Sequence, residues 1–245
     1  NNVHMGLTDR YGGDLIGVSE KLDYLKSLGV ESIYMNPISK SYQNAGYGTV
    51  DYNQIDPAFG DADAVTAMVK AIHNNDMRVM TDVVLYFSPY YSIYVNKGNV
   101  NPLDGAIQSA ISPFTQMIKF TNWPNYEVTE WGGLYTNLFN TSLQNLLYKT
   151  QNSAMQRMLR EYKFDGFRFD CGGYLGSKTD SELRNTLIKD IRLSLKDANP
   201  EMLMLSEYDY PNMTKYSWDS QWNLDLRSAF DVFITGELMS GQTYS

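Results

Sequence analysis

The fold class is indicated most clearly by the stretch Met77-Arg78-Val79-Met80-Thr81-Asp82-Val83-Val84-Leu85. It is a nearly continuous apolar run, typical of a strand that is buried on both faces of a parallel sheet. Similar runs predict strands at 30–36, 164–170 and 202–206, and a weaker one predicts a strand at 221–226. Helical patterns separate these strands, so the chain has the alternation that is typical of a βα-repeating fold.

Apolar residues at helical spacing predict the helices of this alternation. The first is expected over 16–28 and ends at Gly29, and the second begins after Asp61, a good N-cap. Others are expected at 143–162, before Pro200 and at 227–240. On the helix before Pro200, Leu183, Leu187, Ile191 and Leu195 are expected to face the core.

Residues 86–142 break this rhythm, since they are rich in Asn, Pro, Tyr and Gly and show no sustained period. A structureless loop of this length is improbable in a compact domain, so we expect an inserted subdomain. The chain would then consist of a first barrel part at 1–85, the inserted subdomain at 86–142 and a second barrel part at 143–245.

About five strands are predicted, whereas a parallel βα barrel needs eight in about 250 residues. We therefore expect an α/β fold of the (β/α)8 TIM-barrel type that is incomplete in this chain. An open doubly wound sheet is the rival architecture, but no Gly-x-Gly-x-x-Gly phosphate loop follows any predicted strand.

Composition excludes several classes of function. Lys and Arg number 20 against 28 Asp and Glu, a net charge of −8, which argues against nucleic acid or an anionic membrane as partner. No apolar run approaches the ~20 residues that span a bilayer. The single Cys171 excludes an internal disulfide, and two histidines leave little room for a His-rich metal site.

Three acids stand at predicted strand ends, where βα barrels place their chemistry: Asp82, Asp170 and Glu207. Asp170 and Glu207 follow consecutive strands, so their carboxyl groups should be neighbours, as glycoside hydrolysis requires. Arg168 shares a strand face with Asp170 and should lower its pKa, while an unpaired and drier Glu207 should stay protonated. The alternative is that these acids cap helices or pair with surface lysines.

Aromatic residues gather in two places in the sequence. One group lies in the expected subdomain and another flanks the last strands: Trp123, Tyr126, Trp131, Tyr135, Tyr208, Tyr210, Tyr216, Trp218 and Trp222. They are either platforms on which sugar rings stack or packing that anchors long loops, and the sequence does not decide between these readings.

At this point the chain resembles the α-amylase family, glycoside hydrolase family 13. Gly12–Leu15 and Lys21–Val30 are similar to the family's first helix and second strand, and Gly46–Tyr52 and Ile55–Gly60 to its following segments. Gly166–Asp170 resembles the family's nucleophile motif and Leu205–Glu207 its proton-donor motif. The resemblance implies a (β/α)8 barrel with a subdomain after strand three. This chain would hold strands two to six, as a piece of a longer protein truncated at both ends.

The resemblance also implies roles. Asp170 would be the nucleophile, Glu207 the proton donor and Arg168 the residue that orients Asp170. Tyr47 would stack on the sugar, and Asp82 and Tyr208 would also lie against the substrate. The implied activity is retaining hydrolysis of α-glucosidic bonds in starch or maltodextrin, with no cofactor required for the chemistry.

Two departures from the family stand in the third-strand motif, where Tyr86 and Phe87 replace the usual Asn and His. Phe87, in the position of a substrate-binding residue, cannot donate a hydrogen bond. Tyr86, and Asn137 in place of an Asp, weigh against the family's structural calcium. These departures motivate an alternative, a non-catalytic glucan-binding or interaction protein. The compartment is unknown from the sequence, with a secreted or periplasmic location slightly favoured over a cytoplasmic one.

Overall fold

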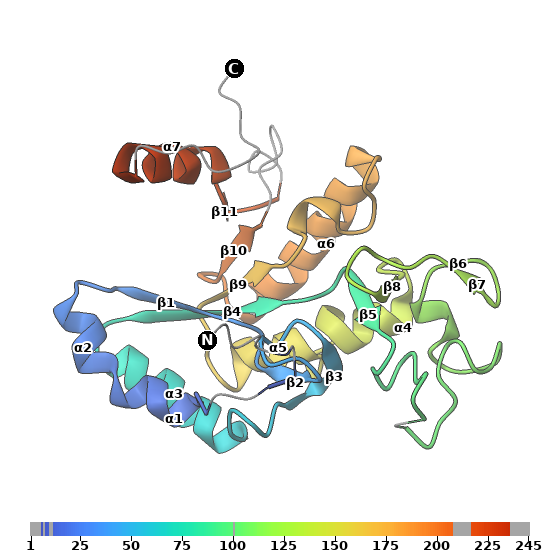
Figure 1. The fold of residues 1–245 in the computed structure, drawn as a ribbon, viewed down its shortest axis with the longest axis horizontal. Helices are drawn as coiled ribbons and strands as arrows, with labels where there is room; N and C mark the ends of the chain where they lie inside the picture. The colour runs from blue at the N-terminus through green and yellow to red at the C-terminus, as the bar shows by residue number, and fades with distance from the viewer. Residues whose placement is uncertain (1–5, 7, 10–11, 100, 208–216, 236–245) are drawn as a thin grey trace.

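A computed structural model describes residues 6, 8–9, 12–99, 101–207 and 217–235. Its centre is a sheet of five parallel strands in the order β1-β4-β9-β10-β11, with β1 and β11 at its edges (Figure 1). The strands are β1 Ser32–Met35, β4 Arg78–Val83, β9 Gly166–Phe169, β10 Leu203–Ser206 and β11 Ser220–Gln221. The first four confirm the predicted strand positions. The fifth is shorter than predicted, because a helix begins at Leu224.

The helix predicted over 16–28 consists of two helices, α1 Leu15–Glu20 and α2 Leu22–Ser27. Asp14 caps α1 by accepting a hydrogen bond from the Gly17 amide at 2.7 Å. Lys21, with φ −101° and ψ 4°, leaves the helical conformation and separates the two. The helix α3 Ala62–Asn74 confirms the prediction after Asp61, whose side chain accepts from the Ala64 amide.

The single helix predicted over 143–162 is wrong. The structure has α4 Thr141–Gln144, a π-helical turn Asn145–Lys149 and then α5 Ala154–Arg160. The wider turn ends at Thr150, where the backbone becomes extended (φ −99°, ψ 158°), so the helix cannot continue into α5. The predicted inward residues of α5, Met155, Met158 and Leu159, are buried.

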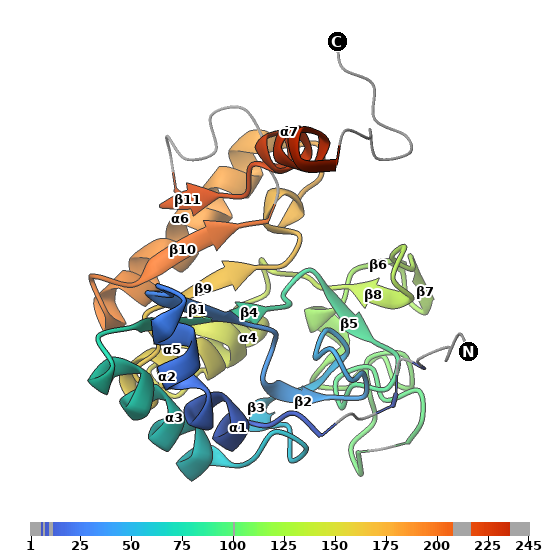
Figure 2. The same ribbon diagram turned by 60° about the vertical axis from the view of Figure 1, so that its left-hand side comes forward.

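The last two helices follow β9 and β11. Helix α6 Ser181–Ala198 runs alongside β9 and β10 (Figures 1 and 2) and buries Leu187, Ile191 and Leu195 as predicted. Leu183, in contrast, is 41% exposed, because it lies in the first turn of the helix. Helix α7 Leu224–Thr235 starts earlier than predicted, and the expected residues after 235 lie outside the described part of the chain.

Residues 86–142 form several short elements of their own (Figure 1). These are β5 Phe87–Pro89, the 3₁₀ turn η1 Thr115–Met117, β6 Phe120–Asn122, β7 Asn125–Tyr126 and β8 Gly133–Tyr135. The antiparallel pairing of β5 with β8 brings the two ends of this segment together. A small apolar cluster of Val95, Ala106, Ile118 and Leu134 lies within it, apart from the main core.

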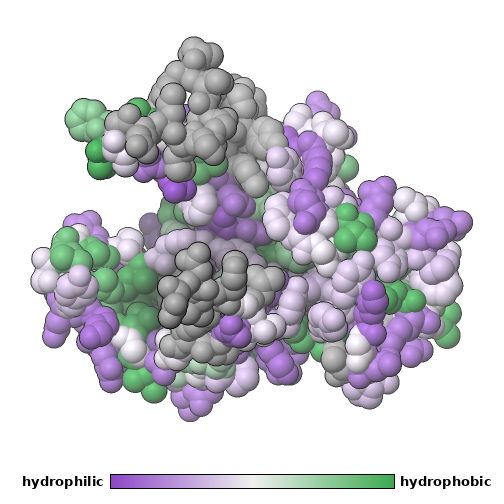
Figure 3. Space-filling model, viewed as in Figure 1, coloured by the Kyte–Doolittle hydropathy of each residue, from purple (hydrophilic) through white to green (hydrophobic). Residues whose placement is uncertain are grey.

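Strands β2 Ser39–Ser41 and β3 Thr49–Ile55 pair in another two-stranded sheet. In the sequence they lie between β1 and α3. In the space-filling view of Figure 3, apolar residues gather on the left, over α2, and on the upper left, over α7. Exposed side chains on α2, at its C-cap and on α7 include Tyr24 and Leu28 at 61% each and Phe233 at 85%. Among the described residues, no helix combines the length and apolar character that crossing a bilayer demands.

Candidate active site

The carboxyl ends of β4, β9 and β10 meet at one edge of the sheet and carry three acids. The parallel register places Asp82 of β4 opposite Arg168 of β9. Asp170 directly follows the last residue of β9, and Glu207 directly follows the last residue of β10. Because neighbouring parallel strands end at the same edge, these side chains converge on one point.

Arg168 is the centre of this cluster. Its side chain is only 2% exposed. One guanidinium nitrogen donates to Asp82 Oδ2 at 2.5 Å and to Asp170 Oδ1 at 2.9 Å, and the other lies 2.8 Å from Glu207 Oε1. Two charge-assisted hydrogen bonds and one ion pair hold the guanidinium in one orientation and draw the three acids together.

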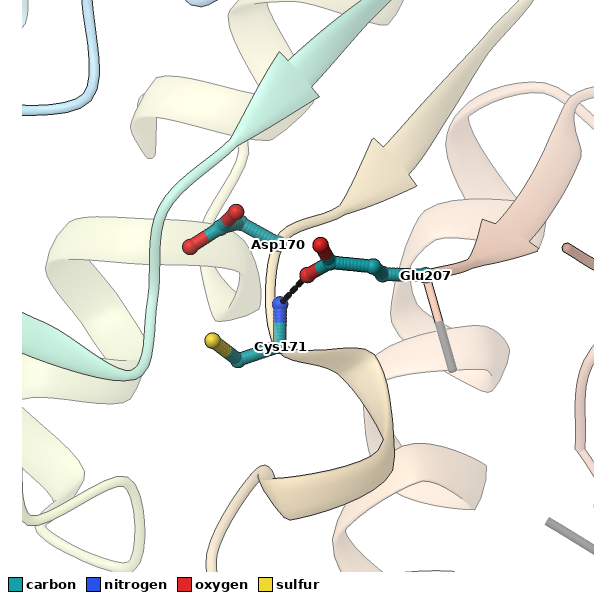
Figure 4. Close-up of side chains that lie close together, drawn as sticks. All are labelled: Asp170, Cys171 and Glu207. Carbon is teal, nitrogen blue, oxygen red and sulfur yellow. Dashed lines mark hydrogen bonds between the residues drawn. The ribbon is translucent and has the colours of Figure 1, made fainter. Parts of the chain in front are cut away.

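Glu207 extends from the end of β10 toward Asp170 and Cys171, which follow β9 (Figure 4). One carboxylate oxygen of Asp170, one of Glu207 and the Sγ of Cys171 all lie within 4.8 Å of one another. The Cys171 amide donates to Glu207 Oε2 at 2.6 Å. Cys171 has φ 50° and ψ 34°, a left-handed conformation that is uncommon for a residue with a side chain. The backbone after β9 therefore turns sharply, and this turn directs the amide at Glu207.

The predicted charge states of this pair are wrong in two respects. Glu207 is not unpaired, because it forms an ion pair with Arg168 and accepts a hydrogen bond from the Cys171 amide. The pKa of Asp170 is raised, mainly by burial and then by the neighbouring Glu207 carboxylate, although Arg168 opposes this rise. Arg168 is shared among three acids, so it lowers the pKa of Asp170 less than an arginine paired with Asp170 alone would.

Asp82 has a fully buried side chain at the base of the cluster. Its Oδ2 accepts hydrogen bonds from Tyr34 at 2.7 Å and Tyr47 at 2.8 Å, besides the bond from Arg168. Burial raises the pKa of Asp82 to about 7. Within the described structure, Oδ1 of Asp82 is buried and has no hydrogen-bond partner.

Sequence reasoning missed Tyr34, and it did not predict that Tyr47 contacts Asp82; the sugar stacking of Tyr47 stays a prediction. Tyr47, expected to stack on a sugar, uses its hydroxyl to bond Asp82 and keeps a half-buried ring. Tyr34 lies on β1, and the strand-end position of β1 was the signal that could have pointed to it. Trp222 lies over the Arg168 guanidinium at 4.3 Å and packs edge-on against Tyr34 at 6.2 Å.

Tyr86 and Phe87 are both buried, rather than open to a ligand. The Phe87 ring stacks on Trp131 with centroids 6.2 Å apart, and Tyr86 meets Trp131 edge-on at 5.9 Å. Trp131 itself is 44% exposed and covers them. Tyr208, the remaining predicted substrate-binding residue, lies outside the described residues.

The residues at the family's calcium positions do not fit that ion. The Lys178 ammonium lies 5.6 Å from the Tyr86 ring centroid, where it would repel a divalent cation. Asn137 uses its amide nitrogen to donate to the Gln116 carbonyl at 3.1 Å. This donor set has a cation and an engaged amide in place of carboxylates, so we assign no role to calcium.

The cluster of Asp170, Cys171 and Glu207 has the spacing of a metal site, the one such group among the described residues. Both carboxylates are already paired with Arg168. Burial and the two acids strongly raise the pKa of Cys171, so its thiol keeps its proton and is a poor ligand. We therefore interpret the cluster as acids arranged for reaction.

The family model for the alpha-amylase catalytic domain matches residues 3–245, and the chain belongs to this family. A maltogenic alpha-amylase from Bacillus acidopullulyticus is 30% identical over 210 residues, which cover 80% of this chain and 32% of that protein. A cyclomaltodextrinase from Thermoanaerobacter pseudethanolicus is 27% identical over 241 residues, covering 96% of this chain and 40% of the relative. The chain thus spans between 32% and 40% of the length of these relatives.

Solved structures agree with this assignment. A cyclomaltodextrinase superposes with a TM-score of 0.74 at 26% identity, covering 94% of this chain and 40% of the other. The type III pullulan hydrolase from Thermococcus kodakarensis gives 0.75 at 25% identity, covering 98% of this chain and 44% of the other. These neighbours are amylase TIM-barrel enzymes, whereas the described residues here form an incomplete α/β domain around an open sheet.

Proposed function

We propose that this chain carries the catalytic centre of a retaining glycoside hydrolase that cleaves α-glucosidic bonds of starch or maltodextrin-like glucans. Family membership and relatives named maltogenic amylase and cyclomaltodextrinase support the substrate class. We also propose that the parallel sheet is strands two to six of a (β/α)8 barrel, with 86–142 as a subdomain inserted after strand three.

One observation carries the proposal: oxygens of Asp170 and Glu207 lie within 4.8 Å of one another at adjacent strand ends. Retaining enzymes hold their two carboxyl groups about 5–5.5 Å apart, whereas inverting enzymes leave about 6.5–9.5 Å for a water molecule. The short separation therefore favours a covalent intermediate over direct attack by water. The two side chains are 14% and 19% exposed, so both reach solvent and a substrate.

In this mechanism Asp170 attacks the anomeric carbon and forms a glycosyl ester, while Glu207 gives a proton to the departing glycosidic oxygen. Glu207 then takes a proton from water, and that water releases the sugar from Asp170 with its original α configuration. Each step moves one proton through Glu207, and Asp170 leaves the cycle unchanged.

The neighbouring residues would position the pair. Arg168 donates a hydrogen bond to Asp170 at 2.9 Å and forms an ion pair with Glu207 at 2.8 Å, and it would keep the Asp170 carboxylate in place while Glu207 changes protonation state. The Cys171 amide would hold the second oxygen of Glu207. Asp82, bonded to Tyr34 and Tyr47, would anchor Arg168 from below and bring Tyr47 to the edge of the sugar site.

The test is a comparison of Asp170→Asn with the parent protein on starch, maltodextrin and pullulan. We expect the variant to lose at least about a thousandfold in kcat, because it removes the nucleophile. Asp197→Asn, at a side chain that is 80% exposed and distant in sequence from the strand ends, is the matched control. Equal activity of Asp170→Asn and the parent protein would remove Asp170 from this role.

Two further measurements distinguish the proposed retaining hydrolase from the non-catalytic alternative. In Asp170→Gly, added azide should restore turnover and give a glycosyl azide, since the small anion replaces the missing carboxylate. Product anomers followed by NMR should be α in the parent protein. The non-catalytic alternative, which rests on Tyr86 and Phe87, predicts tight maltooligosaccharide binding with no turnover at any pH.

A further inference from the structure

We propose that a cleft within residues 115–137 is a second α-glucan-binding site, separate from the strand-end acids. The identity of its ligand rests on the proposed function, because the same polymer would occupy both places. Its lining residues come from η1, β6, β8 and the turns beside them in the segment 86–142; Figure 1 labels β6 and β8 in this segment.

The cleft is large enough for a sugar chain. Its volume is about 610 Å³, within the roughly 300–1,000 Å³ that small-molecule sites usually have. Its walls combine aromatic rings, side-chain amides, hydroxyl groups and one charge of each sign. The lining residues used below are Gln116, Lys119, Phe120, Thr121, Trp123 and Glu127.

Trp123 is the main platform. Its indole Nε1 donates to the Ala106 carbonyl at 3.0 Å, which fixes the ring, and the residue remains 38% exposed. Phe120, beside it on β6, is held edge-on by Tyr126 with centroids 6.2 Å apart. Fixed and partly exposed rings offer flat apolar surface to the faces of pyranose rings at little cost in conformational entropy.

The polar groups of the cleft suit a neutral ligand that is rich in hydroxyl groups. Lys119 and Glu127 contribute one charge of each sign, so the site has no net charge to select an ion. Lys119 Nζ donates a hydrogen bond to the Gly176 carbonyl at 2.9 Å. Partial burial lowers the pKa of this lysine. Gln116 and Thr121 add an amide and a hydroxyl, which both donate and accept hydrogen bonds.

This cleft and the strand-end acids have no residue in common. Tyr135 lines the cleft and also meets Tyr86 edge-on at 5.2 Å. Its hydroxyl donates to Glu130 at 3.4 Å and accepts from the Lys178 ammonium at 3.3 Å, and neither of these two residues lines the cleft. Neither Asp170 nor Glu207 lines the cleft, so a glucan bound there is expected to leave both acids free.

The test measures binding and turnover separately in the same protein. Trp123→Ala should weaken binding to soluble starch, measured by retardation in a starch-containing native gel, by about tenfold. Its kcat/KM on a short chromogenic maltoside should stay within twofold of the parent, because such a substrate fills only the strand-end site. Ile111→Ala, at a 94% exposed apolar side chain of the same segment outside the cleft, is the control and should change neither.

Gln116→Ala keeps the test valid if Trp123→Ala perturbs folding, since Gln116 is exposed and its loss removes only an amide from the cleft. It should weaken retardation by a smaller factor. Unchanged retardation in both variants would overturn the second site. Failure of the proposed function has a different signature, namely full starch hydrolysis by Asp170→Asn, so the two ideas fail independently.

Discussion

The strand-end cluster and the cleft in 86–142 are built in opposite ways. At the strand ends, Arg168 and Asp82 have side chains 2% and 0% exposed, and each is held by several charged or hydroxyl partners. In the cleft, Trp123 is exposed and is held by a single hydrogen bond. One region fixes charges inside a parallel sheet, and the other presents rings on a short strand and on the turn that follows it.

The difference shows what each kind of scaffold can supply. Adjacent parallel strands align their ends to within hydrogen-bond distance, which suits reactions that need two acids in a fixed relation. Short antiparallel strands and turns leave rings open to solvent, which suits binding of a flexible polymer with little positional demand. We therefore expect substitutions in the first region to affect stability and chemistry together, and those in the second to affect mainly binding.

The largest effect is expected from Arg168→Met. It leaves three acids at the strand ends without their shared guanidinium, and removing one partner of a buried ion pair costs about 3–5 kcal/mol. Arg160→Met is the matched control, because Arg160 pairs with Asp197 at an exposed site, where a pair contributes about 0–1 kcal/mol. Urea unfolding of both variants measures the difference, and equal losses would contradict the central role of Arg168.

A pair of glycine substitutions compares the two regions directly. An alanine Cβ at Gly166 would lie 2.4 Å from the Leu203 carbonyl oxygen, so β9 and β10 must separate. We expect a loss of about 3 kcal/mol in unfolding free energy and reduced turnover. At Gly105 the Cβ would lie 2.1 Å from the Val95 oxygen, so the backbone there must shift. The next residue, Ala106, accepts the hydrogen bond that fixes Trp123. Gly105→Ala should therefore weaken starch binding while turnover of short maltosides persists.

Gly13→Ala is the control for this pair, because a Cβ there meets nothing within 4 Å. Thermal unfolding, starch retardation and maltoside kinetics of the three variants give the comparison. Loss of turnover in Gly105→Ala equal to that in Gly166→Ala would show that the two regions are not independent.

A smaller effect is expected in the pH dependence of stability. The folded-state pKa of Asp82, about 7, lies above its ordinary value of 3.8, so the folded protein binds more protons between these values. Stability should therefore be greatest at low pH within this window and fall as pH rises, by about 2 kcal/mol from pH 5 to pH 7. Asp82→Asn should flatten this slope in urea unfolding, and a slope as steep as that of the parent would contradict the assignment.

Much of the fold follows from local patterns. The apolar runs around Asp82 and Phe167 predict buried parallel strands, and consecutive strands predict that Asp170 and Glu207 are neighbours. The break between the π-helical turn and α5 falls at residues 150–153, Thr-Gln-Asn-Ser, which contain neither Gly nor Pro and which the exposed face of one continuous helix could also accommodate. Apolar spacing alone does not distinguish a continuous helix from one interrupted by a wider turn.

The charge states of the site could not be predicted from the sequence. The effect of Arg168 depends on how many acids share it and on burial, and neither quantity is local. Tyr34 reaches Asp82 across 48 positions in the chain, a contact that only the folded sheet creates. The cleft at Trp123 has the same origin, since its residues come from short strands that have no sustained sequence period.

The sharing of one guanidinium among Asp82, Asp170 and Glu207 has a consequence for titration experiments. When any one of these acids gains a proton, Arg168 can shift its hydrogen bonds toward the other two, so the three titrations are coupled. An inflection in a pH–rate profile then belongs to the ensemble of protonation microstates. Assigning it to a single side chain requires a site-resolved probe, such as the carboxyl carbon resonance of each acid.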